Sequence, residues 1–315
     1  MGDIIDLTRS GVKFADPVRT ASGDQRAEVP FTRLQTLWIN TGTLCNIECA
    51  NCYIESSPTN DRLTYITAEE AGPLIDEAVA LGAQEIGFTG GEPFMNAAVF
   101  SMLDHVLRSG LRALVLTNAM RPMMRPRTQD ALAKLIDEWP EKLALRVSLD
   151  HYTADLHDKE RGAGSFDEAM RGLAWLAAQG ARPSVAGRSC LSETEDGARA
   201  GYGALFQRRG LPIDAADPAQ LVLFPEMDAA GDPPEITEAC WDILGKSPDE
   251  IMCASSRMVV KRKGDTAPSV LACTLIPYSD EFNLGRTLRE ATTPVKLNHP
   301  NCATFCVLGG SNCSA

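Results

Sequence analysis

Three cysteines in the first fifth of the chain have the spacing of metal ligands. Cys45, Cys49 and Cys52 form the pattern Cys-x3-Cys-x2-Cys directly after an expected strand, so their thiolates would share one loop at its C-terminal end. A structural zinc site would need a fourth Cys or His close by, and this loop has none. Three thiolates can bind a 4Fe–4S cluster in which one iron has no protein ligand and stays open to another molecule. Taken alone, the triplet leaves zinc or chance as alternatives.

An open iron also indicates what chemistry the loop could perform. Such an iron can chelate a small ligand through an amine and a carboxylate, which leaves a sulfonium group of that ligand close enough to accept an electron from the cluster. Reductive cleavage of a carbon–sulfur bond then becomes possible. The triplet therefore favours redox chemistry on a bound sulfonium compound.

A glycine-rich turn follows the next expected strand. Residues 89–93 read TGGEP, in which the paired glycines let the backbone approach a ligand and expose polar groups along an edge. The carboxylate of Glu92 can accept a hydrogen bond from a bound ammonium group. For this segment alone an ordinary Gly-Gly-Pro turn is the alternative. Its position one strand after the triplet favours ligand binding.

The remaining cysteines form a second group near the C-terminus. In a chain expected to be cytoplasmic, clustered cysteines indicate metal ligation or redox chemistry rather than disulfides. Cys190 and Cys240 stand apart and are interpreted as small buried apolar residues. The C-terminal group consists of Cys253, Cys273, Cys302, Cys306 and Cys313. One cubane needs four ligands, so one cysteine would be spare, and a zinc-stapled tail is the alternative.

Composition excludes several classes of partner. Thirty Lys and Arg against 42 Asp and Glu give a net charge of −12, which repels nucleic acid and acidic membranes. The N-terminus has no apolar stretch long enough for a signal peptide, and no later run approaches the roughly 18 residues of a membrane span. The sequence therefore predicts a cytoplasmic protein with no nucleic-acid and no membrane partner.

Short β-rich runs alternate with helical patterns between residues 35 and 225, which predicts parallel βα units. Six strands are expected, at Leu37–Asn40, Glu85–Thr89, Ala113–Asn118, Ala144–Asp150, Pro183–Gly187 and Gln220–Phe224. Helix starts are indicated by three pairs with capping-box spacing, Thr67 with Glu70, Ser165 with Glu168, and Ser192 with Glu195. The fold class is therefore α/β, with a partial (β/α)6 TIM-like barrel.

The pattern changes after Pro225, where a segment rich in Asp, Gly and Pro predicts a linker. Beyond it, Arg257–Arg262 and Ser269–Cys273 are expected to form a hairpin, followed by a short helix around Arg286–Ala291. This predicts an N-terminal extension (1–30), the barrel (31–228) and a small α+β cluster-binding domain (239–315).

The motif CNIECANC, followed about 40 positions later by TGGEP, resembles the radical S-adenosylmethionine (radical SAM) superfamily. The resemblance covers about residues 35–225 and includes Thr117–Asn118, Val147–Asp150 and HDKERGAGSFDEAMRGLAWL. It implies a catalytic 4Fe–4S cluster and S-adenosylmethionine as cofactors. It also implies reductive cleavage of S-adenosylmethionine to a 5'-deoxyadenosyl radical that abstracts hydrogen from a substrate.

The same resemblance assigns roles by position. The cysteine triplet would bind the cluster, while Gly90, Gly91 and Glu92 would hold the methionyl amino group. Ser148 and Asp150 would lie near the ribose or the substrate. No catalytic residue beyond these ligands is identified.

Other positions near the predicted site are less typical of the family. The family often has an aromatic residue before the third cysteine, but this position is Asn51, so Tyr53 or a backbone contact would have to support the adenine. Arg188 could pair with the cofactor's carboxylate through its bidentate fork, with a solvated loop charge as the alternative. His151 and His157 lack metal-ligand spacing and stay unassigned.

The C-terminal cysteines resemble a Twitch or shortened SPASM domain, in which a hairpin and a short helix hold an auxiliary 4Fe–4S cluster. That cluster would transfer electrons or bind substrate. The resemblance also implies an external low-potential electron donor such as flavodoxin or ferredoxin.

Only 44 residues precede Cys45, which is short for a leader-peptide-binding domain, so a small-molecule substrate is expected. The alternative is a maturase that crosslinks or oxidises a ribosomal peptide. A non-enzymatic metal scaffold or electron carrier is disfavoured, because it would have no need for the TGGEP motif or for the SLD motif at residues 148–150.

Overall fold

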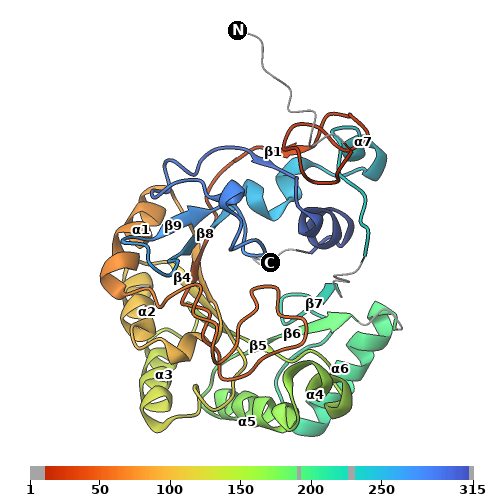
Figure 1. Cartoon of the computed structure of the whole chain (residues 1–315). Helices are drawn as coiled ribbons and strands as arrows, with labels where there is room; N and C mark the ends of the chain where they lie inside the picture. The colour runs from red at the N-terminus through yellow and green to blue at the C-terminus, as the bar shows by residue number, and fades with distance from the viewer. Residues whose placement is uncertain (1–10, 190–192, 226–230, 312–315) are drawn as a thin grey trace.

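The computed structural model describes residues 11–189, 193–225 and 231–311. Figure 1 shows a strongly curved sheet with helices along its outer side. Eight strands form it in the order β7-β6-β5-β4-β3-β2-β8-β9. Their bounds are β2 (Thr36–Asn40), β3 (Glu85–Thr89), β4 (Arg112–Thr117), β5 (Leu143–Ser148), β6 (Ser184–Ser189), β7 (Leu221–Pro225), β8 (Ser256–Val260) and β9 (Ser269–Leu271).

The six predicted barrel strands correspond to β2 through β7, within two residues at each end. Each pairs in parallel with the next, so their C-terminal ends meet at one edge of the sheet. Strands β7 and β9 form the two sides of the sheet, which is therefore an open barrel. The prediction of an α/β partial barrel is confirmed.

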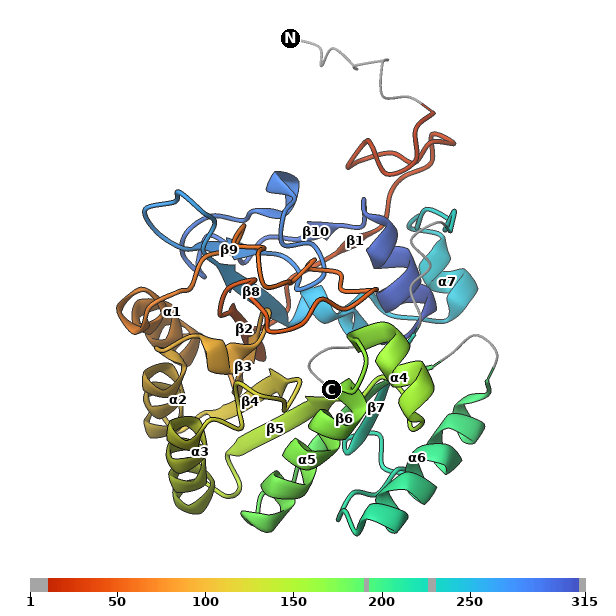
Figure 2. The same cartoon turned by 60° about the horizontal axis from the view of Figure 1, so that its bottom comes forward.

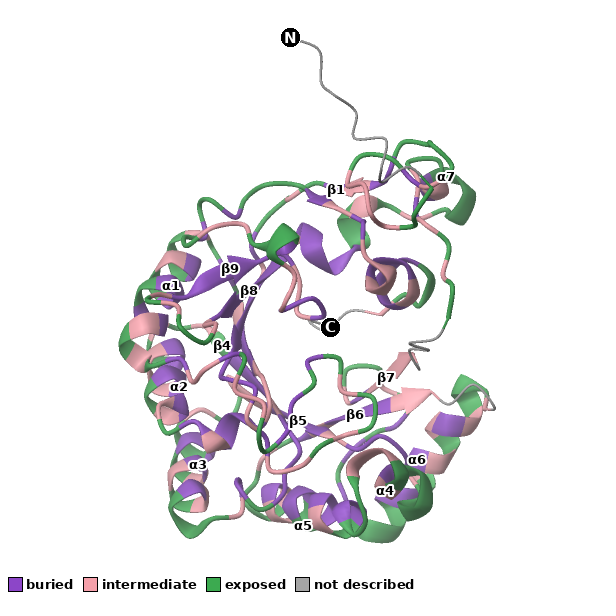
Figure 3. Cartoon of the chain, in the orientation of Figure 1, coloured by how far each residue is buried: buried purple, intermediate pink, exposed green. Residues whose placement is uncertain are grey.

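Helices follow most strands of the sheet. They are α1 (Ala68–Ala80), α2 (Val99–Arg108), α3 (Pro126–Glu138), α4 (Ala154–Arg161), α5 (Ser165–Ala178), α6 (Glu195–Arg209) and α7 (Cys240–Leu244), with 3-10 turns at Pro93–Met95, Pro248–Glu250, Met252–Ala254 and Asp280–Phe282. Helix α7 lies away from this sheet, whose outer face is covered by α1, α2, α3, α5 and α6 (Figure 1). Figure 3 shows their buried sides facing the strands and their exposed sides facing outward. No helix of the described residues is both long and apolar enough to cross a membrane.

Of the three predicted capping boxes, one forms, one does not, and one includes a residue outside the described ranges. Thr67 and Glu70 cap α1 reciprocally. At α5 the prediction is wrong, because Ser165 lies inside the helix and its hydroxyl donates to Asp158 instead. Ser192 lies outside the described residues, and Thr194 caps α6.

The predicted C-terminal hairpin forms and extends the barrel sheet. Strand β8 pairs antiparallel with β9 and parallel with β2. A second apolar core therefore fills the inner side of the sheet, where Trp38 of β2 and Met258 of β8 meet Phe305. Phe305 belongs to a π-helix at Cys302–Leu308.

The helix expected around Arg286–Ala291 does not form, and the chain makes a turn there. Carboxylates bind the backbone amides at the start of this segment and hold it in the turn. Glu290 accepts from the amides of Arg286 and Thr287 at 2.7 and 3.1 Å, and Glu77 accepts from that of Leu288 at 2.8 Å. Such side-chain hydrogen bonds compete with helix formation.

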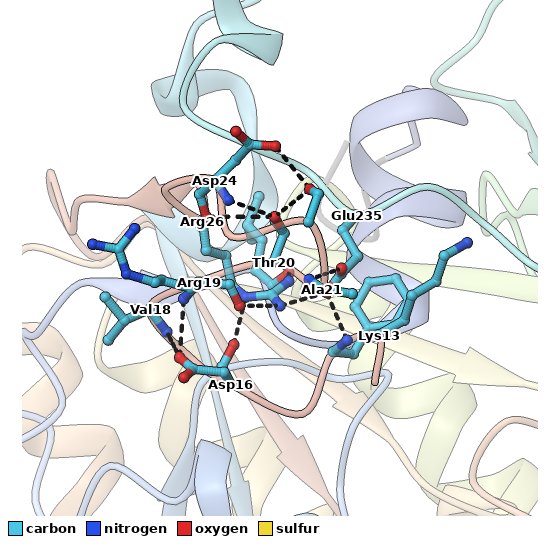
Figure 4. A network of polar contacts seen from close by, with 12 residues as sticks. Lys13, Asp16, Val18, Arg19, Thr20, Ala21, Asp24, Arg26 and Glu235 are labelled. Carbon is cyan, nitrogen blue, oxygen red and sulfur yellow. Dashed lines mark hydrogen bonds and ion pairs between the residues drawn. The ribbon is translucent and has the colours of Figure 1, made fainter. Parts of the chain in front are cut away.

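The N-terminal residues pack against the C-terminal segments. Strand β1 (Glu28–Val29) pairs with β10 (Val295–Lys296). Figure 4 shows a polar network centred on the ion pair of Arg26 and Glu235, whose N–O distance is 2.5 Å. Residues 13–26 surround this pair. Arg26 is fully buried and also donates to the carbonyls of Asp16, Arg19 and Leu297.

Candidate active site

The ends of the parallel strands border a cavity of about 160 Å³. The loop after β2, which carries the cysteine triplet, lies over these strand ends (Figure 2). All the residues predicted for the catalytic site line the cavity except Glu92. They are Cys45, Cys49, Asn51, Cys52, Tyr53, Gly90, Gly91, Ser148, Asp150 and Arg188. The fold thus brings together side chains that lie far apart in the sequence.

The thiols of the triplet are shielded from water. Cys45 is buried, and Cys49 and Cys52 are half-buried. Burial, aided by the nearby Glu92 and the other two thiols, raises the pKa of Cys45 to about 12. Burial also raises the pKa of Cys49, although Arg161 opposes it. The free thiols of Cys45 and Cys49 are therefore protonated at neutral pH, and a metal must displace these protons to bind.

The paired glycines hold the TGGEP turn against the loop that carries the cysteines. The amide of Gly91 donates to the carbonyl of Gly42 at 2.8 Å, and that of Glu92 donates to the carbonyl of Leu44 at 3.3 Å. A Cβ atom on Gly91 would lie 2.1 Å from the oxygen of Leu44. Gly90 has φ = +135°, and its Cβ would lie 2.5 Å from the oxygen of Gly42. Glycine is therefore required at both positions by sterics.

Glu92 lies behind the cavity wall. Its carboxylate accepts hydrogen bonds from the amide of Phe94, the hydroxyl of Thr117 and the amide of Asn118, at 3.2, 2.9 and 2.8 Å. Burial raises the pKa of this carboxyl to about 7, against the lowering effect of these donors. Glu92 therefore joins the turn after β3 to the end of β4. Of the predicted amino-group ligands, Gly90 and Gly91 line the cavity.

A buried ion-pair network forms the wall at the ends of β5 and β6. Arg161 at the end of α4 donates to both carboxylate oxygens of Asp150, at 2.7 and 3.1 Å. Arg188 lies 3.3 Å from the same carboxylate. Burial raises the pKa of Asp150, but Arg161 and Arg188 outweigh it and hold the pKa below its usual value. Asp150 is therefore ionised at neutral pH.

The same network holds the cysteine loop in place. Asn51, between Cys49 and Cys52, donates to both carboxylate oxygens of Glu160 at 3.0 and 2.9 Å. Arg188 donates to the carbonyl of Asn51 at 3.1 Å, and its side chain is only 17% exposed. The alternative of a solvated loop charge for Arg188 is therefore wrong. Asn51 anchors the loop to α4 with its side chain.

Tyr53 and Phe224 connect the cavity with the C-terminal π-helix. Both residues line the cavity, and both rings contact Phe305, at centroid distances of 6.4 and 5.4 Å. Phe305 lies between Cys302 and Cys306 in the sequence, so this aromatic contact links the two cysteine groups.

Sequence reasoning missed Asn40 and Ser56, which are buried and line the cavity. Asn40 Oδ1 accepts from the amide of Gly42 at 2.9 Å, which fixes the orientation of its side-chain amide. Asn40 Nδ2 and Ser56 Oγ have no hydrogen-bond partner in the described residues. Because buried polar groups are almost always paired, the cavity fits a polar ligand such as S-adenosylmethionine. Neither residue stands in a motif that would have revealed it.

Arg161 was also missed, although it ends the segment HDKER, and its charge lies near Cys49 and Cys52. The two histidines do not line the cavity. His157 Nδ1 accepts from the amide of Asp150 at 3.1 Å, and burial lowers the pKa of His157 to about 4. His151 contacts Thr153 and stacks on Tyr152. Both therefore have structural partners.

Four of the five C-terminal cysteines line one small apolar cavity, of about 20 Å³. They are Cys253, Cys273, Cys302 and Cys306, whereas Cys313 lies outside the described residues. All the described cysteines are free thiols, and Cys240, at the start of α7, is half-buried. In the described ranges no three metal-binding side chains are close enough to hold a single ion.

Comparison with known proteins identifies a matching family and several relatives that are similar over part of the chain. Residues 39–196 match the Radical SAM superfamily. AlbA, the antilisterial bacteriocin subtilosin biosynthesis protein of Bacillus subtilis, is 31% identical over 43% of this chain and 29% of its own length. Mycofactocin maturase MftC of Mycobacterium tuberculosis is 29% identical over 43% of this chain and 32% of its own length. The match spans about a third of each relative.

Solved structures with the same fold include two with a bound ligand. SuiB of Streptococcus suis, bound to S-adenosylmethionine, has a TM-score of 0.59 at 13% identity and covers 80% of this chain and 63% of SuiB. Native anSMEcpe with bound AdoMet has a TM-score of 0.59 at 16% identity, and the match covers 84% of this chain and 82% of the anSMEcpe chain. At these identities the likeness concerns the fold. The family match covers half of the chain, and the chain therefore belongs to the radical SAM superfamily of enzymes.

Proposed function

We propose that this chain cleaves S-adenosylmethionine reductively at a 4Fe–4S cluster held by Cys45, Cys49 and Cys52. The observation that carries the proposal is the convergence of these three thiols with Gly90 and Gly91 on one cavity. A cluster and S-adenosylmethionine bound there would supply a 5'-deoxyadenosyl radical for hydrogen abstraction from the substrate.

The chain's own residues would bind the cofactor and keep the site dry. The carbonyl groups of Gly90 and Gly91 would accept hydrogen bonds from the methionyl ammonium, and Ser148 would donate to the ribose. Asp150 and Arg188 would lie at the ribose or carboxylate end of the cofactor. Apolar lining from Trp38, together with Leu116 and Phe224, would exclude water from a reactive intermediate.

The proposal includes an auxiliary 4Fe–4S cluster in the C-terminal cavity. Its ligands would be Cys253, Cys273, Cys302 and Cys306, which line that cavity together. A cubane takes one thiolate on each of four separated irons, whereas zinc draws four sulfurs around one point. An external electron donor such as flavodoxin or ferredoxin would reduce the protein.

A small molecule is the proposed substrate, and a ribosomal peptide is the alternative. The names of AlbA and MftC favour the alternative, because both denote proteins of bacteriocin or mycofactocin formation. SuiB has also been solved with its precursor peptide SuiA. GTP 3',8-cyclase of Haemophilus influenzae, 26% identical over 48% of this chain and 44% of its own length, is named for a small-molecule substrate.

Metal analysis of anaerobically reconstituted protein tests the assignment of both sites. We expect about eight irons and eight sulfides per chain, and about four of each in C45A/C49A/C52A, because each cubane contains four. C253A/C302A should also retain about four. Zinc in place of iron in the wild type would contradict the two-cluster proposal, and a triple variant that keeps all its iron would contradict the triplet as ligands.

A further inference from the structure

Arg257 of β8 is an unusual residue for a protein interior. Its side chain is 1% exposed, and its guanidinium lies 4.5 Å from the centre of the Phe31 ring. It donates to the carbonyls of Ala291, Cys253, Ser256 and Thr293, at 2.7, 2.5, 2.7 and 2.9 Å. These contacts satisfy its hydrogen bonds but do not neutralise its charge.

Arg257 has no carboxylate partner among residues 11–189, 193–225 and 231–311. A buried charge without a counter-ion is strongly unfavourable. Arg26 provides the comparison inside the same protein, because it is equally buried but is paired with Glu235 (Figure 4). The position of Arg257 therefore requires an anion of another kind.

The nearest groups that can become anionic are the C-terminal cysteines. Arg257 contacts the backbone of Cys253, whose thiol lines the C-terminal cavity with Cys273, Cys302 and Cys306. Once bound to metal, four cysteines become thiolates and make the centre a net anion.

We propose that Arg257 is the buried counter-charge of a tetrathiolate metal centre in the C-terminal cavity, where it stabilises the loaded site and raises its reduction potential. The inference rests on the proposed auxiliary cluster. Arg257 is a positioning residue that touches the ligand's backbone and acts through charge. Because reduction adds an electron to an already negative centre, a nearby cation favours the reduced state.

The test uses the full chain in the C45A/C49A/C52A background, so that the measured potential and iron content belong to the C-terminal site alone. In R257Q, which keeps donor groups but loses the charge, the midpoint potential should become more negative. Iron should be lost to a chelator about 10–100-fold faster, as is usual for residues that support metal ligands. R257K, which keeps the charge, should lie close to the parent in both measurements.

A second variant leaves Arg257 in place in case R257Q does not fold. Thr293 is exposed and its backbone carbonyl accepts from Arg257, so T293D adds a negative charge to a residue that contacts the guanidinium. T293D should shift the potential in the same direction as R257Q, while T293N should not.

Equal shifts in R257Q and R257K, or no shift in T293D, would overturn the proposal in favour of a role in hydrogen bonding alone. If the site holds zinc, the auxiliary-cluster proposal fails, but faster zinc loss in R257Q than in R257K still supports the counter-charge. If the site binds no metal, this inference is wrong, whereas nucleoside release by the wild-type chain would leave the catalytic proposal standing.

Discussion

Replacing Gly91 with alanine is expected to lower the rate of 5'-deoxyadenosine release at least ~100-fold, since displacements of about 1 Å in an active site cost this much. The added Cβ would lie 2.1 Å from the carbonyl oxygen of Leu44, the residue before Cys45. Backbone atoms cannot rotate away as a flexible side chain can, so the cysteine loop must move. The release rate, measured on reconstituted protein with dithionite, checks this expectation.

Gly82→Ala is the matched control. Gly82 has φ = +81°, but a Cβ there meets no atom within 4 Å. This variant should lose about 1 kcal/mol of stability from backbone strain and keep the wild-type rate of release. A G91A protein that is as active as G82A would show that the close approach of the two loops does not position the cysteines.

Arg161→Met should lower the free energy of unfolding of the metal-free chain by at most about 3–5 kcal/mol, because it removes both hydrogen bonds of a buried ion pair and leaves the Asp150 carboxylate with Arg188 as its cation. Arg161 and Asp150 have side chains that are 12% and 6% exposed. The pKa of Asp150 lies below its ordinary value, so the pair stabilises the fold above that ordinary pKa. This contribution is lost as pH falls through the folded-state pKa. Urea unfolding at neutral and acid pH measures both effects.

Arg171→Ala provides the surface control. Arg171 is 70% exposed, and its nitrogen lies 3.8 Å from Glu168 one helical turn away. Exposed pairs of this kind contribute at most about 1 kcal/mol. If R161M were no less stable than R171A, or if its deficit did not shrink in acid, the ion pair would not stabilise the fold.

The barrel can be predicted from sequence because its strands repeat one simple pattern. Runs such as Arg112–Thr117 carry apolar residues on both faces and alternate with helices of period 3.6, and this pattern predicts parallel βα units. The sequence could not show that β8 adds in parallel to β2. Pairing between distant strands depends on the fold of the whole chain.

The candidate site also has residues that the sequence can predict and residues that only the fold reveals. Cysteine spacing and the TGGEP turn identify the loops that border the cavity, because those residue types have few other uses in that arrangement. Asn40, Ser56 and Arg161 carry no such signal, since polar residues like these are common on any surface. Their burial beside the cavity becomes visible only in the folded chain. Arg257 is similar, because its lack of a carboxylate partner is a property of the packing.

Release of 5'-deoxyadenosine from S-adenosylmethionine tests the central claim most directly. The measurement compares anaerobically reconstituted wild type with C45A/C49A/C52A, with dithionite as the electron source. The account predicts that the wild type releases the nucleoside and that the triple variant releases none, while it keeps the iron of the C-terminal site. A wild type that holds its full iron content and releases no nucleoside would contradict the account.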